Sequence, residues 1–200
     1  MSSVHDNYIF LHIPKCGGTS LRQVLETESN QDRYKCYNHL KYERIPNAKK
    51  SFVFTFVRNP WSRILSLYMF WKNQTPEHIY YRYDKKQVNY IMKNRLDFKS
   101  FINEIAFNKE SIFHIKRHPK PYIGFFFQNP ADLNYIGRVE NMQNDFDTLC
   151  DLIKIDRCTL PHENPSEHNN YTEYYDSESR DIVANLYADD IEYFEYKFDE

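Results

Sequence analysis

Glycine is scarce in this chain, and long apolar runs are absent. Only 4 glycines occur among 200 residues, and two of them are neighbours. No stretch of about 18 apolar residues is present, which excludes a membrane-spanning helix on sequence grounds. The first residues, MSSVHDNYIF, lack a basic segment followed by an apolar one, so the sequence predicts no signal peptide. With no long linker either, we expect a single domain over residues 1–200.

Cysteine and net charge are also low. The 4 cysteines form no C-x-x-C pair and have no histidine at ligand spacing, so the pattern favours free thiols and no metal site. The net charge is −2, but residues 1–121 hold 21 Lys and Arg against 10 Asp and Glu. A basic portion of this kind suits a highly charged anionic ligand. Because its basic residues are scattered and not clustered, we expect no nucleic-acid partner.

The stretch Tyr8–Leu21, YIFLHIPKCGGTSL, has the pattern of a strand, a tight turn and a helix. Glycine allows close approach of the backbone to a ligand, and a helix that begins just after the turn offers free N–H groups and a positive dipole end. Lys15 adds a positive charge, and Thr19 and Ser20 add hydroxyls. The stretch therefore predicts an anion cradle for a phosphate or sulfate ester, although an ordinary strand-to-helix turn is the alternative.

This stretch differs from the nucleotide P-loop GxxxxGK[ST], because its lysine precedes the glycines and no lysine follows Gly18. A second stretch, Phe52–Trp71, reads as a buried strand that ends at Arg58, followed by a helix from Asn59-Pro60. Ser66 lies eight residues after Arg58, about two helical turns along. An arginine at the carboxyl end of a strand points to the ligand crevice of open α/β sheets, so Arg58 and Ser66 are candidates for a second phosphate.

Strands alternate with helices along the rest of the chain. This alternation predicts an α/β fold of the three-layer P-loop type, with a central parallel sheet flanked by helices. The predicted strands include 34–37, 52–57 and 134–139. The predicted helices are one from Thr19 to about Glu28, one from Pro60, one from Phe98 to about Phe107 capped by Asp97, one from Asn144 or Asp145 through Ile153, and a final one capped by Asp176. The polar, tyrosine-rich segment 74–87 is predicted to be irregular.

Four segments together resemble the carbohydrate sulfotransferases of the family-2 type, which include Golgi heparan-sulfate 2-O-enzymes and bacterial relatives. The four segments are PKCGGTS (14–20), RNPWSRILS (58–66), IGRVENMQNDF (136–146) and DIEYFEYKF (190–198). Golgi members of that family carry a membrane anchor. The sequence given has none, so we expect a cytoplasmic location.

The resemblance implies 3′-phosphoadenylyl sulfate (PAPS) as sulfuryl donor and a carbohydrate hydroxyl as acceptor. Lys15 would neutralise charge on the bridging oxygen, while the loop residues Cys16, Gly17, Gly18, Thr19 and Ser20 hold the 5′-phosphosulfate. Arg58 and Ser66 would hold the 3′-phosphate. Arg138 is a further donor-side candidate, with sheet packing as its alternative role.

The acceptor hydroxyl needs a general base with a pKa near neutrality, which favours histidine. His39 follows the second predicted strand, a placement similar to that of the catalytic histidine of the 2-O-enzymes. His114, His118 and Glu43 are the alternatives. Family members often carry H-x-x-P-Q near position 118, where this chain has Tyr122 in place of the glutamine. The loop 164–170 is a candidate to close over the nucleotide.

Two other functions stay open on the sequence alone. A P-loop kinase for a small molecule would need ATP and magnesium, but the lysine of the nucleotide P-loop is misplaced. A non-catalytic nucleotide-binding protein would bind the adenosine bisphosphate without turnover.

Overall fold

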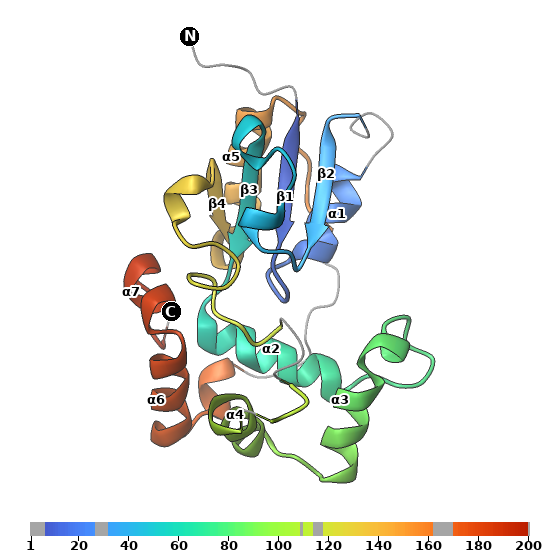
Figure 1. Cartoon of the computed structure of the whole chain (residues 1–200), viewed down its shortest axis with the longest axis vertical. Helices are drawn as coiled ribbons and strands as arrows, with labels where there is room; N and C mark the ends of the chain where they lie inside the picture. The colour runs from blue at the N-terminus through green and yellow to red at the C-terminus, as the bar shows by residue number, and fades with distance from the viewer. Residues whose placement is uncertain (1–6, 27–31, 109, 114–117, 162–169, 200) are drawn as a thin grey trace. The chain divides into compact units, whose positions relative to one another are not determined.

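Four parallel strands form the sheet of the protein, in the order β2-β1-β3-β4 (Figure 1). The strands are β1 (Tyr8–His12), β2 (Tyr34–Asn38), β3 (Phe52–Val57) and β4 (Tyr135–Arg138). The structure is a computed structural model that describes residues 7–26, 32–108, 110–113, 118–161 and 170–199. The chain divides into two compact units: Met1–Arg58 with Lys120–Pro165, and Asn59–Pro119 with Ser166–Glu200. The prediction of one domain over residues 1–200 stays a prediction.

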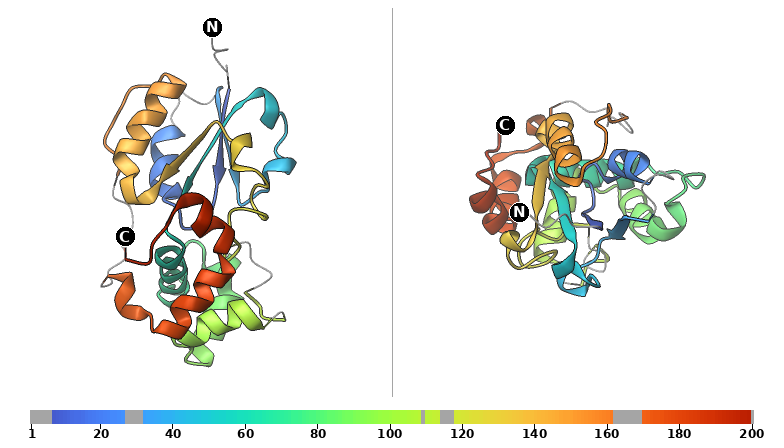
Figure 2. Two further views of the ribbon diagram at one scale, coloured as in Figure 1. Left: turned by 90° about the vertical axis from the view of Figure 1, so that its left-hand side faces the viewer. Right: turned by 90° about the horizontal axis from the view of Figure 1, so that it is seen from above.

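The first unit contains the whole sheet. Its helices α1 (Gly18–Leu25) and α5 (Met142–Ile153) cover one face, and the short 3₁₀ turns η2 (Tyr42–Arg44) and η3 (Ala48–Lys50) lie on the other (Figure 2). Two further 3₁₀ turns, η4 (Pro130–Asp132) and η5 (Val139–Asn141), flank β4. The predicted fold class, α/β with a central parallel sheet and flanking helices, is confirmed.

Buried aliphatic and aromatic residues of β1 and β3 make the centre of the sheet. Phe10 and Phe54 stack with ring centroids 5.2 Å apart, and both are almost fully buried. Thr55 is buried as well, and its hydroxyl donates to the carbonyl of Leu11 at 2.7 Å, so the polar group is satisfied. The two central strands are almost continuously apolar because both faces of the sheet are covered, by α1 and α5 on one side and by η2 and η3 on the other.

Gly137 on β4 lies opposite Phe56 in the strand register. A Cβ atom at position 137 would lie 2.5 Å from the Phe56 ring, which is closer than atoms approach one another. The glycine therefore leaves the space beside β4 that the Phe56 ring occupies.

The second unit is helical. It comprises α2 (Pro60–Lys72), α3 (Tyr81–Lys93), α4 (Phe98–Phe107), the 3₁₀ turn η6 (Tyr171–Tyr174), α6 (Ser177–Leu186) and α7 (Ala188–Phe194). The helix α2 is buried over most of its circumference, including Arg63, whose guanidinium donates to the carbonyl of His118 at 2.9 Å. Asn59 caps α2 as its side chain accepts from the N–H groups of Trp61 and Ser62.

Two predictions for the second unit need correction. The segment 74–87 is not irregular throughout, because α3 begins at Tyr81. Its buried face consists of Asp84, Gln87, Val88 and Ile91, so half of the helical repeat is polar and escapes a search for apolar periodicity. The predicted final helix is followed by a further one, α7.

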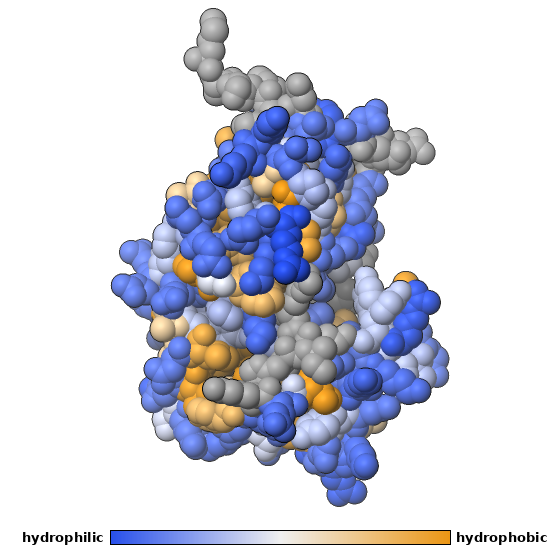
Figure 3. Space-filling model, viewed as in Figure 1, coloured by the Kyte–Doolittle hydropathy of each residue, from blue (hydrophilic) through white to orange (hydrophobic). Residues whose placement is uncertain are grey.

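The face seen in Figure 3 is mainly hydrophilic, and its apolar residues gather in a few areas, most clearly at the lower left. The exposed large apolar residues are Ile79, Tyr80, Tyr83, Met92, Phe107, Leu152 and Tyr193. No helix in the described part of the chain is long and apolar enough to cross a bilayer.

Candidate active site

The strand order places a topological switch point between β1 and β3. The chain runs outward from β1 to β2 in one direction and from β3 to β4 in the other. Ligands of open α/β sheets bind at such a point, outside the carboxyl ends of the strands. Four predicted site residues stand at these ends in the first unit. Lys15, Arg58 and His39 follow β1, β3 and β2, and Arg138 is the last residue of β4.

The loop between β1 and α1 has an unusual backbone. Lys15 and Gly17 both have left-handed conformations, with φ of 67° and 70°. Such a φ is uncommon for lysine and marks a conformation that its surroundings impose. The helix α1 begins at Gly18, directly after this turn. Gly17, at the N-cap position, has no side chain to cap it, and the first N–H groups of any helix lack intrahelical acceptors, so this end of α1 suits an anion.

The two adjacent glycines are required for different reasons. A Cβ atom at Gly17 would lie 2.5 Å from Cε of Met142, at the start of α5, in addition to the left-handed φ. A Cβ atom at Gly18 would lie 1.9 Å from Nε2 of His12. The glycines thus let the loop pack directly on the side chains of Met142 and His12. The sequence analysis explained these glycines by close approach of a ligand to the backbone, and it did not predict the contacts with Met142 and His12.

His12 lies between the loop Lys15–Ser20 and the end of β2. Its Nδ1 donates to Oδ1 of Asn38 at 2.6 Å, across the β1–β2 register. With Nδ1 as the donor, the neutral ring leaves Nε2 as the atom that faces Gly18. Burial lowers the pKa of His12 to about 4, and Arg22 and Lys15 lower it too, whereas Asn38 and Glu26 oppose the shift. His12 is therefore uncharged at neutral pH.

His39 directly follows β2 and has a left-handed φ of 56°. Its N–H donates to the carbonyl of His12 at 2.9 Å, and the two imidazole rings are 5.4 Å apart with an edge-to-face orientation. His39 is half-buried. The predicted base is thus held beside a neutral histidine that also packs against Gly18 of the loop Lys15–Ser20. Its catalytic role stays a prediction.

Arg58 is half-buried and follows the last residue of β3. Its N–H donates to the hydroxyl of Tyr122 at 3.0 Å, and this hydroxyl donates to the carbonyl of Arg58 at 2.7 Å. Tyr122 is the residue that replaces the glutamine of the H-x-x-P-Q pattern, and sequence reasoning assigned it no role. A buried tyrosine needs a partner for its hydroxyl, but nothing in the sequence identifies that partner.

Arg138 ends β4, and its N–H donates to Oδ2 of Asp145 at 2.6 Å. The other carboxylate oxygen of Asp145 accepts from the side chain of Asn141 at 2.8 Å. These bonds tie the end of β4 to the first turn of α5. The backbone of Arg138 therefore has a structural role, and its contact with a donor stays a prediction.

The other predicted residues are placed as follows. Ser66 lies on α2 in the second unit and is buried, and its pairing with Arg58 stays a prediction. Of the alternative bases, His118 belongs to the second unit and Glu43 is exposed on η2. His114 and most of the loop 164–170 lie outside the described residues. Within the residues that the structure describes, no three His, Cys, Asp or Glu side chains form a group able to hold a metal ion.

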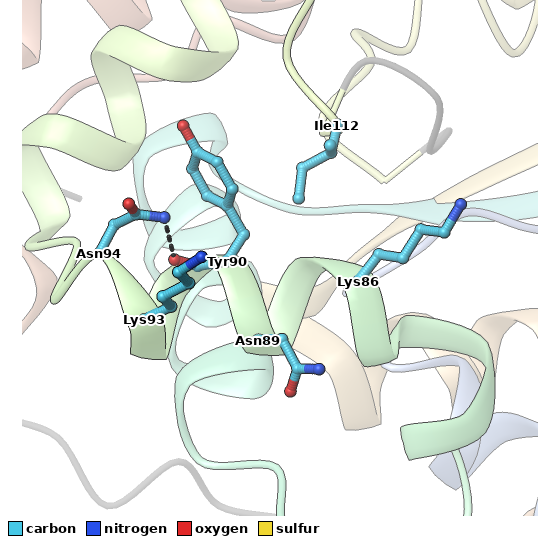
Figure 4. Close-up of a pocket in the computed structure, with 6 residues that line it drawn as sticks. All are labelled: Lys86, Asn89, Tyr90, Lys93, Asn94 and Ile112. Atoms are coloured by element: carbon cyan, nitrogen blue, oxygen red, sulfur yellow. Dashed lines mark hydrogen bonds between the residues drawn. The ribbon is translucent and has the colours of Figure 1, made fainter.

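A shallow depression of about 460 Å³ lies along α3 in the second unit. It is lined by Lys86, Asn89, Tyr90, Lys93, Asn94 and Ile112. Figure 4 shows Asn94, just after α3, donating to the carbonyl of Tyr90, a bond of 2.8 Å. None of the predicted site residues lines this depression.

An α/β sheet with a glycine-containing strand-to-helix loop at its switch point and an arginine at the neighbouring strand end is an arrangement typical of proteins that bind phosphate or sulfate esters. A search of curated proteins found no match to the chain. The model of the sulfotransferase family matches residues 1–197. The chain therefore belongs to the sulfotransferase family, whose members transfer sulfuryl groups.

The contact between Gly18 and His12 predicts that their substitutions compensate each other. Gly18→Ala should lower the free energy of unfolding by about 1–3 kcal/mol, because the new methyl group overlaps the imidazole. In the double variant with His12→Ala, the loss should be smaller than the sum of the two single losses. Urea denaturation measures all three.

Gly124→Ala is the matched control for that experiment. Gly124 has a φ of +80° and nothing within 4 Å of its Cβ position, so it reports backbone strain without a clash. In the double variant Gly124→Ala with His12→Ala, the loss in free energy of unfolding should equal the sum of the two single losses. Strictly additive losses for Gly18→Ala and His12→Ala would contradict the packing described above.

The lowered pKa of His12 predicts part of the acid sensitivity of the fold. The pKa of a histidine in an unfolded chain is about 6.5, so just below that pH the unfolded chain binds a proton at His12 while His12 of the folded chain stays neutral. The contribution of His12 to stability is complete above pH ~6.5 and is lost as the pH falls towards about 4. Between these values, the free energy of unfolding of His12→Asn should therefore fall less steeply than that of the wild type.

Denaturant titrations at several pH values test this difference in slope. His78→Asn, at an exposed histidine, is the control and should follow the wild-type slope. Parallel curves for the wild type and His12→Asn would show that His12 titrates normally in the folded state.

Proposed function

We propose that this protein transfers a sulfuryl group from PAPS to a hydroxyl of a carbohydrate. The observation that carries the proposal is the convergence, at the switch point of one sheet, of the loop Lys15–Ser20 and of Arg58. Membership of the sulfotransferase family supports the reaction class. The carbohydrate acceptor, the cytoplasmic location and the single domain are supported by the resemblance and composition described above.

The residues present suit a donor with two separate phosphate positions. The open amino end of α1 and the Lys15 side chain suit the 5′-phosphosulfate, since both favour negative charge. Arg58, at the neighbouring strand end, suits the 3′-phosphate, with Ser66 as its proposed partner. When bound, PAPS supplies the activated sulfuryl group.

The chain's own residues would then perform three tasks. The N–H groups of the loop orient the sulfuryl oxygens, and Lys15 offsets the charge that grows on the bridging oxygen as it leaves. His39 accepts the proton of the acceptor hydroxyl through whichever ring nitrogen is unprotonated. No metal is required in this scheme, because lysine and backbone donors supply the neutralising charge.

Donor binding is the first test. Adenosine 3′,5′-bisphosphate, the product of the proposed reaction, should raise the melting temperature, because a ligand at 100 times its dissociation constant stabilises by about 2.7 kcal/mol. Lys15→Ala and Arg58→Ala should each weaken its affinity roughly 30- to 1000-fold, the effect of removing a charged donor from a bound anion. Thermal-shift titration measures both.

Lys49→Ala and Arg44→Ala are charge-matched controls at exposed positions of η3 and η2, and they should bind as the wild type does. A larger shift with ATP and magnesium would favour a kinase. Binding of the bisphosphate without turnover of any carbohydrate would favour a non-catalytic nucleotide-binding protein. Equal effects of the site and control variants would reject the predicted cradle.

The role of His39 can be separated from donor binding. His39→Asn should lower kcat by about 10²- to 10⁴-fold, the usual contribution of a general base, and leave the dissociation constant of the bisphosphate unchanged. Sulfuryl transfer to a carbohydrate acceptor, measured alongside calorimetric titration of the bisphosphate, gives both values.

His78→Asn is the control, because His78 is exposed on the second unit. It should change neither value. A wild-type kcat for His39→Asn would show that another residue is the general base, and it would not contradict the proposed donor site.

A further inference from the structure

Tyr122 has more polar contacts than a core tyrosine needs. Its side chain is fully buried, and its hydroxyl contacts both the N–H and the carbonyl of Arg58, at 3.0 and 2.7 Å. The same oxygen lies 3.5 Å from Sγ of Cys16 in the phosphate loop. One phenol therefore touches both segments that the donor is proposed to bind.

The hydrogen-bond directions are fixed by the Arg58 backbone. Its N–H can only donate and its carbonyl can only accept, so the single hydroxyl proton of Tyr122 goes to the carbonyl and a lone pair receives the N–H. The thiol of Cys16 also lies 3.6 Å from the carbonyl of Pro14. Contacts to sulfur are weak, so the link to Arg58 is the stronger of the two.

Arg58 needs this support because it lies past the end of the strand ladder. The pairing of β3 with β4 ends at Val57, and the pairing of β3 with β1 ends already at Phe54. Both backbone groups of Arg58 that a neighbouring strand would bind are bound by Tyr122 instead. Because the direction of a side chain follows from its backbone dihedrals, the phenol fixes where the Arg58 guanidinium can reach.

We propose that Tyr122 is a positioning residue that fixes Arg58 for recognition of the 3′-phosphate of the donor. This inference rests on the proposed function, in which Arg58 binds that phosphate. In this proposal Tyr122 acts through Arg58 and takes no part in the sulfuryl transfer itself. Its loss should therefore weaken only those ligands that carry a 3′-phosphate, whereas a general loss of structure would weaken all nucleotides alike.

The test is the selectivity of Tyr122→Phe, which removes one oxygen and keeps the ring. Calorimetric titration gives the dissociation constants of adenosine 3′,5′-bisphosphate and of adenosine 5′-phosphate, which lacks the 3′-phosphate. In Tyr122→Phe the dissociation constant of the bisphosphate should rise roughly tenfold, the usual effect of losing one buried hydrogen bond. The dissociation constant of the 5′-phosphate should change less than about twofold. In an Arg58→Ala background, Tyr122→Phe should have no further effect on either constant.

Two controls isolate the Arg58 link. Tyr187→Phe removes a buried hydroxyl that donates to the carbonyl of Pro119 at 2.6 Å in the second unit, so it matches the structural loss. Its ratio of dissociation constants should equal that of the wild type. Cys16→Ala removes the sulfur contact and leaves both Arg58 bonds. Because Cys16 belongs to the loop proposed to bind the 5′-phosphate, which both nucleotides carry, any effect should change the two dissociation constants by the same factor and leave their ratio at the wild-type value.

A second measurement needs no variant. In the wild type, hydrogen exchange of the Arg58 N–H should be slowed by the bisphosphate and not by the 5′-phosphate, because the hydrogen bond to Tyr122 and the binding of the 3′-phosphate are coupled. This measurement decides the matter if Tyr122→Phe fails to fold.

The outcomes separate the inference from the proposed function. A wild-type chain with no preference for the bisphosphate would defeat the proposed donor site itself. A clear preference that Tyr122→Phe retains, or equal protection of the Arg58 N–H by both nucleotides, would overturn the role of Tyr122 alone.

Discussion

The close contact between the end of β1 and the start of α1 is the constraint on which the site depends. The imidazole of His12 occupies the space in which any side chain at position 18 would lie. The loop can therefore pack directly on the imidazole, and α1 begins at Gly18 without a side chain between them. The same imidazole holds Asn38 and contacts His39, so the geometry of the loop and that of the β2 end are set by one side chain.

A neutral histidine is suited to this place. A protonated histidine at the same position would add a positive charge beside His39, the proposed base, and would oppose its uptake of a proton. Burial and the nearby Arg22 and Lys15 keep His12 uncharged through the physiological range. The electrostatics and the packing of the site thus depend on the same residue, which the sequence alone indicates only as the polar end of an apolar strand.

The sequence predicts the backbone framework well. The strand Phe52–Val57 and the helix after Asp97 are found with the predicted bounds, because a continuous apolar run and an aspartate cap are local signals. The helix α3 was missed, since two of its buried residues, Asp84 and Gln87, are polar. Within the site, the positions of Lys15, His39 and Arg58 follow from strand ends, which sequence patterns reveal.

The supporting contacts cannot be predicted in that way. The partners of Gly17 and Gly18 are Met142 and His12, and the partner of Tyr122 is the backbone of Arg58. Residues 58 and 122 are 64 positions apart, and the bond forms with main-chain atoms, which leave no trace in residue identity. Such contacts depend on the tertiary fold and only become visible with it.

The bond between Tyr122 and Arg58 also has a meaning for the path of the chain. The first unit ends at Arg58, the chain builds part of the second unit with residues 59–119, and it returns at Lys120, two residues before Tyr122. Departure and return are thus fastened together beside the proposed phosphate site. The two points at which the chain leaves the first unit and re-enters it are therefore joined by the bonds between Arg58 and Tyr122, so both ends of residues 59–119 are held within the first unit.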